Sequence, residues 1–231
     1  MHSGDSSDSD AATFFPATPL FPLPNVVLFP RAVLPLHIFE ERYKAMTAHA
    51  LASEGRIAMA LLKTGWEKNY YGSAAIEPVV CVGRILTHEE LPDGKYNFLL
   101  QGIARCRITR EHRGEPFRVA DLETLEEEAA LDIDLEDHRR RIEIALRGDL
   151  GGLPGSRQFL QMLTSPMATS TVADLIAFHL LEDIPTKQAL LSEQNVHRRV
   201  THLVEALEAI KPEPPVPPVT KVRFPPNPSM N

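Results

Sequence analysis

The 231-residue sequence has few cysteines, few aromatic side chains and no long apolar run. Its two cysteines, Cys81 and Cys106, form no CxxC pair and lie in apolar, strand-like segments. We expect both to be reduced and buried, because a free cysteine packs as a small hydrophobic residue. No run of about 20 apolar residues could span a bilayer, and the acidic start MHSGDSSDSD is unlike a signal peptide. A cytoplasmic protein without a membrane partner is the expectation.

The motifs of common catalytic and cofactor sites are absent from the sequence as well. It contains no GxxxxGK[ST] phosphate loop, no GxGxxG and no GxSxG. HEE at His88–Glu90 lacks the second histidine of HExxH, and DIDLED at Asp132–Asp137 lacks the glycine of a calcium loop. We therefore expect no catalytic residue, no metal site and no cofactor. The formal net charge of -7 makes nucleic acid an unfavourable general partner, because phosphate binding needs a positive surface.

The composition divides the chain into four parts. Residues 1–12 are rich in serine and aspartate, and residues 211–231 contain eight prolines, so both are expected to be tails outside the core. Hydrophobic residues make up 43% of the sequence, enough for a sizeable core between the tails. Residues 13–126 show the pattern of short strands and residues 127–210 that of helices. We predict two subdomains joined by the acidic segment Glu126–Asp137.

The β-rich part contains six predicted strands and one helix. Apolar residues and turn signals place the strands at Val26–Phe29, Val33–Leu36, Arg56–Leu62, Val79–Leu86, Tyr96–Ile108 and Phe117–Leu125. The helix is expected at Glu40–Ser53. Pro24, Pro30 and Pro35 interrupt the first apolar stretch, which predicts edge strands bent at Pro30-Arg31, because proline removes a ladder donor. Asp93-Gly94 predicts an antiparallel hairpin between the fourth and fifth strands.

The strand Tyr96–Ile108 carries an alternating pattern. One set of alternate positions holds Leu100, Gly102, Ala104, Cys106 and Ile108, and the other holds Gln101, Arg105 and Arg107. Strict alternation predicts one face packed inward and one face in water. Small residues on the inner face suit a tightly curved wall.

The helical part is predicted to contain five helices. They are expected at Leu135–Leu146, Arg157–Leu163, Val172–Leu181, Thr186–Leu191 and Val196–Ile210. A capping box of Thr171 with Asp174 is predicted to start the third, Pro185 to lie in the first turn of the fourth, and Asn195 to cap the last.

Polar side chains in the apolar and helical segments are given structural interpretations. His37 is expected to be a hydrogen-bonded structural residue, and His179 a core residue. Arg139-Arg140-Arg141 is expected to form a solvated helical face with ion pairs between residues four apart.

The segment GWEKNYYG, residues 65–72, gathers Trp66, Tyr70 and Tyr71 in a loop bounded by glycines. Two interpretations stand. The loop could fold over the end of the barrel and bury its own rings, or the rings could contact a partner protein, since tryptophan and tyrosine anchor many interfaces.

Three stretches resemble one known family. FPLPNVVLFPRAVLPLHIFEERYKAM, CVGRILTHEELPDGKYNFLLQGIARCRI and VADLIAFHLLEDIPTKQALLSEQNVHRRVTHLVEAL are similar, in this order, to the N-terminal substrate-recognition domain of ATP-dependent Lon proteases. The resemblance runs from Phe21 to Leu207. Ser192 and Asn195 stand where the family often has Glu and Asp. The resemblance implies an α+β fold: a small PUA-like β pseudo-barrel with one inserted helix, followed by a helical bundle.

The resemblance also implies a function. A Lon-like domain without counterparts of the Walker lysine and the catalytic serine is expected to be a stand-alone, non-catalytic module rather than an enzyme. Its expected partners are unfolded or partner polypeptides, and its expected role is that of an adaptor or partner in proteolysis or protein quality control. The alternative is an RNA-binding protein, because PUA-like barrels elsewhere bind RNA; the charge of -7 disfavours it.

Overall fold

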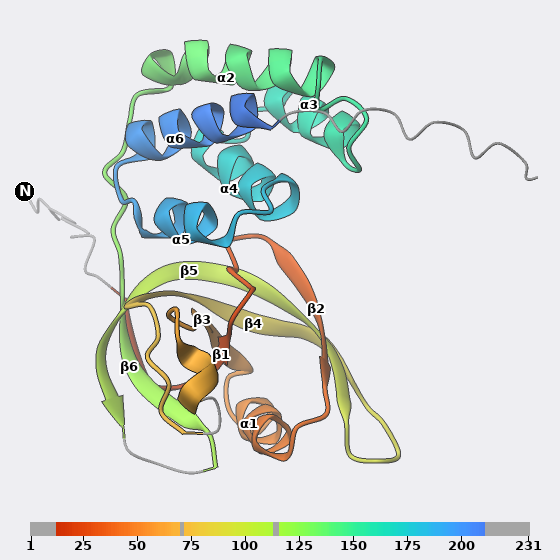
Figure 1. The fold of residues 1–231 in the computed structure, drawn as a ribbon, viewed down its shortest axis with the longest axis vertical. Coiled ribbons are helices and arrows are strands. Elements are labelled where there is room, and N and C mark those ends of the chain that lie inside the picture. The colour runs from red at the N-terminus through yellow and green to blue at the C-terminus, as the bar shows by residue number, and fades with distance from the viewer. Residues whose placement is uncertain (1–12, 70–71, 113–115, 211–231) are drawn as a thin grey trace, which may run out of the picture.

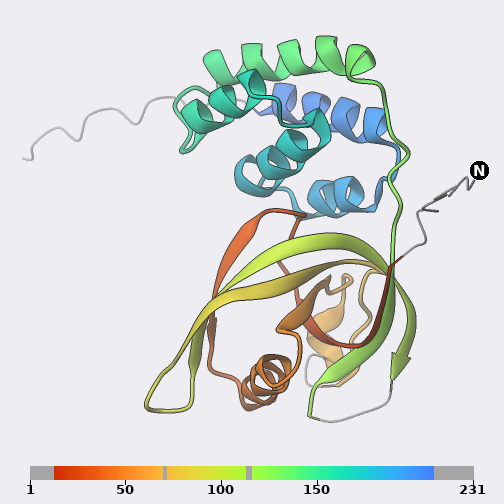
Figure 2. The same ribbon diagram turned by 180° about the vertical axis from the view of Figure 1, so that it is seen from behind.

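The computed structural model describes residues 13–69, 72–112 and 116–210. Figures 1 and 2 show a strongly curved sheet with helices stacked over one side and a further helix, α1, at the opposite end. The strands are β1 (Phe14–Leu23), β2 (Val33–Ile38), β3 (Arg56–Leu61), β4 (Val79–Glu90), β5 (Tyr96–His112) and β6 (Arg118–Thr124). They follow the order β2-β5-β4-β3-β1-β6, and an additional β5–β6 pairing closes the sheet. The predicted α+β fold, a β pseudo-barrel followed by a helical bundle, is confirmed.

The predicted hairpin and edge strand are present. β4 and β5 pair antiparallel along their length, and Gly94 occupies the turn with a φ of 72°. β2 lies at the edge of the sheet order and contains Pro35, in agreement with the edge-strand interpretation. The strand predicted at Val26–Phe29 is wrong: this segment has no strand pairing, although Val27, Leu28 and Phe29 are buried.

β1 is a strand that the sequence analysis missed, because it contains Pro16, Pro19 and Pro22. Its first part pairs antiparallel with β6, and its last part, from Leu20 onward, pairs parallel with β3. Within the described sheet, Pro19 pairs only with β6 and Pro22 pairs only with β3. At each proline the other edge of β1 has no partner strand, so a backbone N–H donor is not needed there. Pro16 lies in a register shift beside Ala17, whose φ is 43°.

A β-bulge in β5 overturns the predicted alternation. Val82 pairs with Ala104 and the next residue, Gly83, pairs with Gly102, so Ile103 is an extra residue in β5. A bulge of this kind exchanges the two faces of the strand beyond it. Gly102 precedes the bulge, and Arg105, which follows it and pairs with Cys81, lies on the same face and is buried rather than wet.

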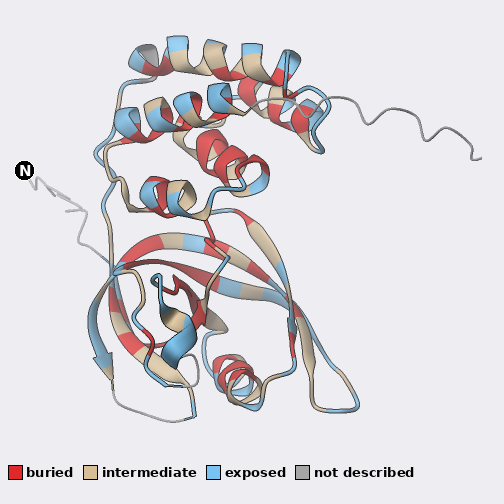
Figure 3. Ribbon diagram, in the orientation of Figure 1, coloured by how far each residue is buried: buried red, intermediate tan, exposed pale blue. Residues whose placement is uncertain are grey.

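The two faces of the sheet contribute to two apolar clusters. The smaller cluster is made largely of small residues from the closed part of the sheet: Phe15, Leu20, Ala58, Ala60, Val80, Val82, Cys106, Ala120 and Leu122. The larger cluster continues from the other face into the helices, so one core joins the β and helical parts. Figure 3 shows buried residues concentrated where these elements face one another. Cys81 and Cys106 are buried free thiols, as predicted.

Gly102 is required by a close approach of the backbone. Its N–H donates to the carbonyl oxygen of Ala32 at 2.9 Å, and its carbonyl accepts from the N–H of Arg31 at 2.7 Å. A Cβ atom at this position would lie well inside van der Waals contact with the carbonyl oxygen of Phe29. Gly102 is therefore small because the segment 29–32 crosses close to β5, which differs from the curved wall that the sequence analysis predicted.

Six α-helices accompany the strands in the described part of the chain. They are α1 (Glu41–Leu51), α2 (Asp132–Arg147), α3 (Ser156–Thr164), α4 (Thr169–Leu180), α5 (Ile184–Ser192) and α6 (Val196–Ala209). Asn195 caps α6 by accepting from the Arg198 N–H at 3.0 Å, and Pro185 lies in the first turn of α5, both as predicted. The division into two subdomains at the Glu126–Asp137 segment stays a prediction.

Three predictions about polar residues of the helices are wrong. α4 begins at Thr169, so Thr171 lies inside the helix, and Asp174 is buried instead of capping it. His179 is exposed rather than in the core, because it lies on the side of α4 that faces a groove. The solvated face predicted for Arg139-Arg140-Arg141 is wrong for Arg139, whose guanidinium donates to the carbonyl oxygens of Leu163 and Ser165 at the end of α3, at 2.7 and 3.0 Å. Arg140 is exposed, and Arg141 forms a surface ion pair with Glu208 of α6 instead of a residue four positions away.

Within the described ranges, none of the helices combines the length and apolar character needed to cross a membrane.

Candidate functional site

Of the three aromatic residues singled out in the sequence, the structure describes Trp66. Trp66 begins a single 3-10 turn, Trp66–Asn69, and its side chain is half-buried. Tyr70 and Tyr71 lie outside the described residues. The contact surface proposed for Trp66, Tyr70 and Tyr71 therefore stays a prediction.

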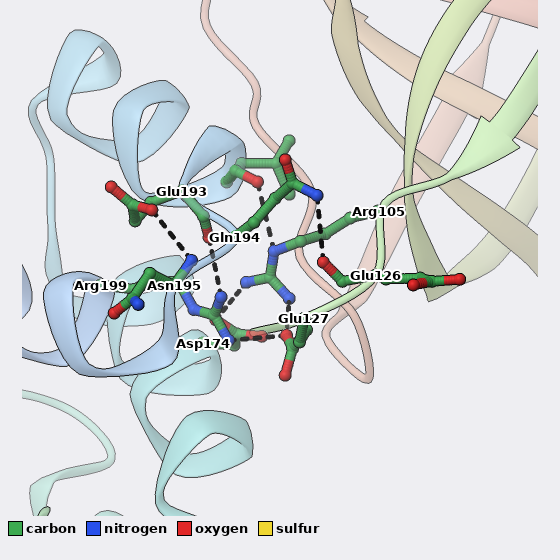
Figure 4. Close-up of polar contacts among 9 residues, drawn as sticks. Arg105, Glu126, Glu127, Asp174, Glu193, Gln194, Asn195 and Arg199 are labelled. Atoms are coloured by element: carbon green, nitrogen blue, oxygen red, sulfur yellow. Dashed lines mark hydrogen bonds and ion pairs between the residues drawn. The ribbon is translucent and has the colours of Figure 1, made fainter. Parts of the chain in front are cut away.

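A buried polar cluster lies where the helices meet the sheet (Figure 4). Arg105 of β5 donates from Nη2 to Asp174 of α4 at 2.5 Å, from Nη1 to Glu127 at 2.8 Å, and from Nε to the Leu191 carbonyl at the end of α5 at 3.2 Å. Arg199 of α6 donates from Nη2 to the same Glu127 oxygen at 2.6 Å, and its Nε lies 3.3 Å from Asp174. The cluster thus connects a strand, the segment after β6 and three helices.

The electrostatics of this cluster indicate a positioning role. Burial raises the pKa of the Asp174 carboxyl, and the Arg105 and Arg199 charges oppose this shift without cancelling it. Burial also lowers the pKa of Arg199, and the neighbouring Arg105 charge adds to this effect. The free-energy cost of desolvating Asp174 and Arg199 thus offsets much of the attraction between the charges, as is common for buried ion pairs. The cluster connects the helices to the sheet, and its charges are paired with one another, although the buried Arg199 Nε forms no hydrogen bond.

The sequence analysis missed this cluster for two reasons. The bulge moves Arg105 to the buried face of β5, and the spacing of Thr171 and Asp174 resembles that of a capping box. The available signal was a pair of charged residues, Asp174 and Arg199, at apolar-facing positions of their helices. Buried charges of this kind are seldom found unless they are paired.

A shallow groove of about 420 Å³ lies on the exposed end of the sheet, where β2, β5 and β4 run side by side. We call it the hairpin groove. Strand pairing sets Pro35 opposite Leu99, and Leu99 opposite Thr87. The next row joins His37, Asn97 and Glu89. The groove residues are Pro35, Leu36, His37, Thr87, His88, Glu89, Asn97, Phe98 and Leu99.

Large apolar side chains are exposed in the hairpin groove and next to its lining residues. Leu99 lines the groove and is 38% exposed, Leu86 precedes the lining residue Thr87 and is 48% exposed, and Phe39 follows Ile38 at the end of β2 and is 60% exposed. The ring of Phe39 stacks on His37 with a centroid distance of 6.2 Å, and His37 Nδ1 donates to Asn97 Oδ1 at 2.7 Å. His37 is therefore hydrogen-bonded as predicted, at an exposed position. Apolar residues gathered at one surface are typical of a docking site.

The residues of the hairpin groove suit binding of a polypeptide rather than catalysis. No lysine or arginine lines it, so it offers no phosphate-binding charge. Among the described residues, no group of three histidine, cysteine or acidic side chains could hold a metal ion. Apolar contacts with a few amide, imidazole and carboxylate groups suit an extended polypeptide segment better than a reacting substrate.

Comparison with known proteins identifies the family. The family model described as "ATP-dependent protease La (LON) substrate-binding domain" matches residues 17–209. The chain belongs to this Lon substrate-binding domain family. The family confirms the resemblance seen in the sequence and supports a substrate-recognition module.

Curated relatives are full-length proteases. Lon protease 1 of Syntrophobacter fumaroxidans is 29% identical over 196 residues, which cover 84% of this chain and 24% of the relative. Lon protease of Trichlorobacter lovleyi is 29% identical over 194 residues, which cover 82% of this chain and 23% of the relative. The chain therefore spans about a quarter of the length of these relatives, and only the substrate-binding domain is matched.

Solved structures share the fold. The N-terminal domain of the Mycobacterium avium complex Lon protease aligns with a TM-score of 0.64 at 17% identity and covers 84% of this chain and 98% of that chain. A Lon N-terminal domain protein from Xanthomonas campestris aligns with a TM-score of 0.59 at 21% identity, covering 83% and 98%. The Lon N-terminal fold thus extends over most of the described residues.

Proposed function

We propose that this Lon substrate-binding domain recognises polypeptides without catalysing a reaction, and that the hairpin groove is a contact surface for them. The observation that carries the proposal is the exposure of Leu99 in the hairpin groove, of Phe39, which stacks on the groove residue His37, and of Leu86, which precedes the groove residue Thr87 in β4. Unfolded segments expose apolar side chains, and burying one such side chain contributes about 1.5–3 kcal/mol. The same surface would serve an adaptor or a partner in proteolysis or protein quality control.

The alternative of RNA binding receives less support. The hairpin groove lacks lysine and arginine among its lining residues, and the whole chain carries a formal net charge of -7. RNA-binding surfaces combine basic side chains with aromatic rings on which bases stack. Submicromolar, sequence-dependent RNA binding at physiological salt would reverse this preference.

The proposal can be tested with fluorescein-labelled, reduced and carboxymethylated α-lactalbumin as an unfolded probe, measured by fluorescence anisotropy. Leu86→Ser with Leu99→Ser should weaken binding about tenfold or more, because two apolar contacts are lost. The matched control is Leu131→Ser with Ile144→Ser. These residues are 71% and 60% exposed near the ends of α2, away from the hairpin groove. Equal losses in both variants would mean non-specific adhesion and would refute the site.

The predicted aromatic surface can be tested in the same assay. If Trp66, Tyr70 and Tyr71 contact a partner, Trp66→Ala with Tyr70→Ala should weaken probe binding and leave the melting temperature nearly unchanged. If the loop is packed on the barrel, the same variant should lose roughly 3 kcal/mol or more of stability, the cost of truncating a buried large aromatic residue. That outcome would remove these residues from the site.

A further inference from the structure

A second and larger groove lies in the helical part. It has a volume of about 700 Å³ and is formed by the segment between α2 and α3, the end of α4, the start of α5 and the end of α6. We call it the helical groove. It shares no lining residue with the hairpin groove, and its size falls within the range of about 300–1,000 Å³ that is usual for ligand sites.

The helical groove has an apolar floor. Leu150, Leu180 and Leu181 are buried beneath it, Leu153 is 36% exposed at its edge, and Ile210 is half-buried at the end of α6. A ligand with aliphatic or aromatic side chains could cover this floor and exclude water from it.

Carboxylates surround this floor. Asp149, Glu182 and Asp183 line the helical groove and are exposed, whereas no lysine or arginine lines it. Asp183 is occupied as the cap of α5, accepting from the Thr186 N–H at 2.8 Å. Asp149 and Glu182 make no hydrogen bond or ion pair with any described residue. Two carboxylates of the rim are therefore available to a cationic partner.

Lys187 is a basic group close to Glu182: burial lowers the pKa of Lys187, and the Glu182 charge opposes this shift. The two side chains form no ion pair, because the Lys187 ammonium points to α4 and donates to the Phe178 carbonyl oxygen at 2.8 Å. Desolvation by the neighbouring side chains, together with the Lys187 charge, lowers the pKa of the exposed His179, which favours the neutral imidazole near pH 7. The carboxylates do not form a metal-binding group with the described histidine, cysteine or acidic residues. The surface is thus apolar and anionic.

We infer that the helical groove binds a short polypeptide segment in which lysine or arginine flanks aliphatic or aromatic side chains. This inference rests on the proposed function, polypeptide recognition, and adds a second surface with a defined preference. Apolar side chains of the segment cover Leu153 and Ile210, and its basic side chains pair with Asp149 and Glu182. Acidic peptides and phosphate-bearing ligands are repelled by the same carboxylates.

Three fluorescein-labelled peptides provide the probes for the inference: GKLFRLG, its acidic counterpart GELFELG, and GKSSRSG, which lacks the apolar residues. We expect GKLFRLG to bind about tenfold or more tightly than either control peptide, with an affinity that falls as salt increases. Equal binding of all three peptides by anisotropy would overturn the inference.

The site is tested by Asp149→Lys with Glu182→Lys in the full chain. This variant should lose at least tenfold in GKLFRLG affinity. The matched control, Glu126→Lys with Glu136→Lys, makes the same charge change at exposed residues that do not line the helical groove, and should retain affinity within about twofold. Far-UV circular dichroism verifies that each variant is folded. Equal losses in both variants would mean a general charge effect and would overturn the assignment.

The chain contains its own segment of this chemistry, Lys221–Phe224, in the sequence that follows the groove residue Ile210. If GKLFRLG binds the Lys221→Glu with Arg223→Glu variant but not the unaltered chain, the intrachain segment occupies the helical groove. The assignment to a partner polypeptide then fails. Binding by the unaltered chain supports the inference.

The two proposals fail in different ways. If Leu86→Ser with Leu99→Ser abolishes binding of the unfolded probe while the helical-groove variant still binds GKLFRLG normally, the inference fails and the proposed function stands. If GKLFRLG binding depends on Asp149 and Glu182 but the hairpin-groove variant still binds the unfolded probe, the proposed hairpin surface fails and the helical groove stands.

Discussion

Replacing Asp174 with alanine should be among the most damaging single changes at the junction between sheet and helices. Asp174 is 4% exposed, and it faces Arg105 and Arg199, which are 5% and 1% exposed. Without this carboxylate, Glu127 is the one carboxylate left to the two buried guanidiniums among the described residues, beside backbone carbonyl oxygens. Removing one member of a buried ion pair costs about 3–5 kcal/mol, because the remaining charge stays desolvated.

The magnitude can be compared with a surface pair of the same chemistry. Arg141 and Glu208 lie 2.7 Å apart, and both side chains are more than a third exposed. Glu208→Ala should therefore have little effect on stability, because exposed ion pairs contribute little. For a chain of this size, 1 kcal/mol shifts the melting temperature by about 2–4 °C, so Asp174→Ala should lower it by about 6–20 °C, and Glu208→Ala should lower it far less.

Urea unfolding should be followed by two probes. The fluorescence of Trp66, the only tryptophan, reports on the β part, and circular dichroism reports on the helices. A combined variant, Arg105→Met with Asp174→Leu and Arg199→Met, should recover most of the stability, since apolar groups replace the desolvated charges. A loss below about 1 kcal/mol for Asp174→Ala would refute the reasoning, because it would mean that water reaches the cluster and screens its charges.

Two further predictions concern the sheet. Gly102→Ala should destabilise the protein by about 1–3 kcal/mol, because the added methyl group meets the Phe29 carbonyl oxygen; an unchanged urea midpoint would show that the β5 backbone can move away. Cys81 and Cys106 should react very slowly with Ellman's reagent at pH 8 in the folded protein and rapidly in urea. Burial raises the pKa of Cys106 to about 12 and that of Cys81 further still, and only the thiolate is nucleophilic. Rapid labelling of the native protein would show that the thiols are accessible.

Sequence reasoning worked where one local signal dominated. The last predicted helix, α6, and its cap at Asn195 are both present, and Asp93-Gly94 forms the turn of the β4–β5 hairpin. It failed where a local rule was overridden by tertiary pairing. The three prolines of β1 argue against a strand, yet that strand forms because its neighbours change along its length. A single extra residue, Ile103, moved Arg105 to the buried face.

The candidate sites were harder to predict than the fold. The hairpin groove combines residues from β2, β4 and β5, and the helical groove brings Asp149, Glu182 and Ile210 together from separate helices and connections. Each of these residues is ordinary in its own segment, and only the packing of the segments creates the surface. The aromatic loop around Trp66 was the visible local signal, and its role stays a prediction.

The split pairing of β1 also has a consequence for the order of events during synthesis. β1 is translated before both of its partner strands, β3 and β6, and β6 ends only at Thr124. The backbone N–H and C=O groups of β1 therefore stay unpaired with β6 while most of the sheet is translated. An open apolar strand invites pairing with other nascent chains, and proline is a residue that blocks such pairing. Pro16, Pro19 and Pro22 thus protect the first strand until the barrel can close around it.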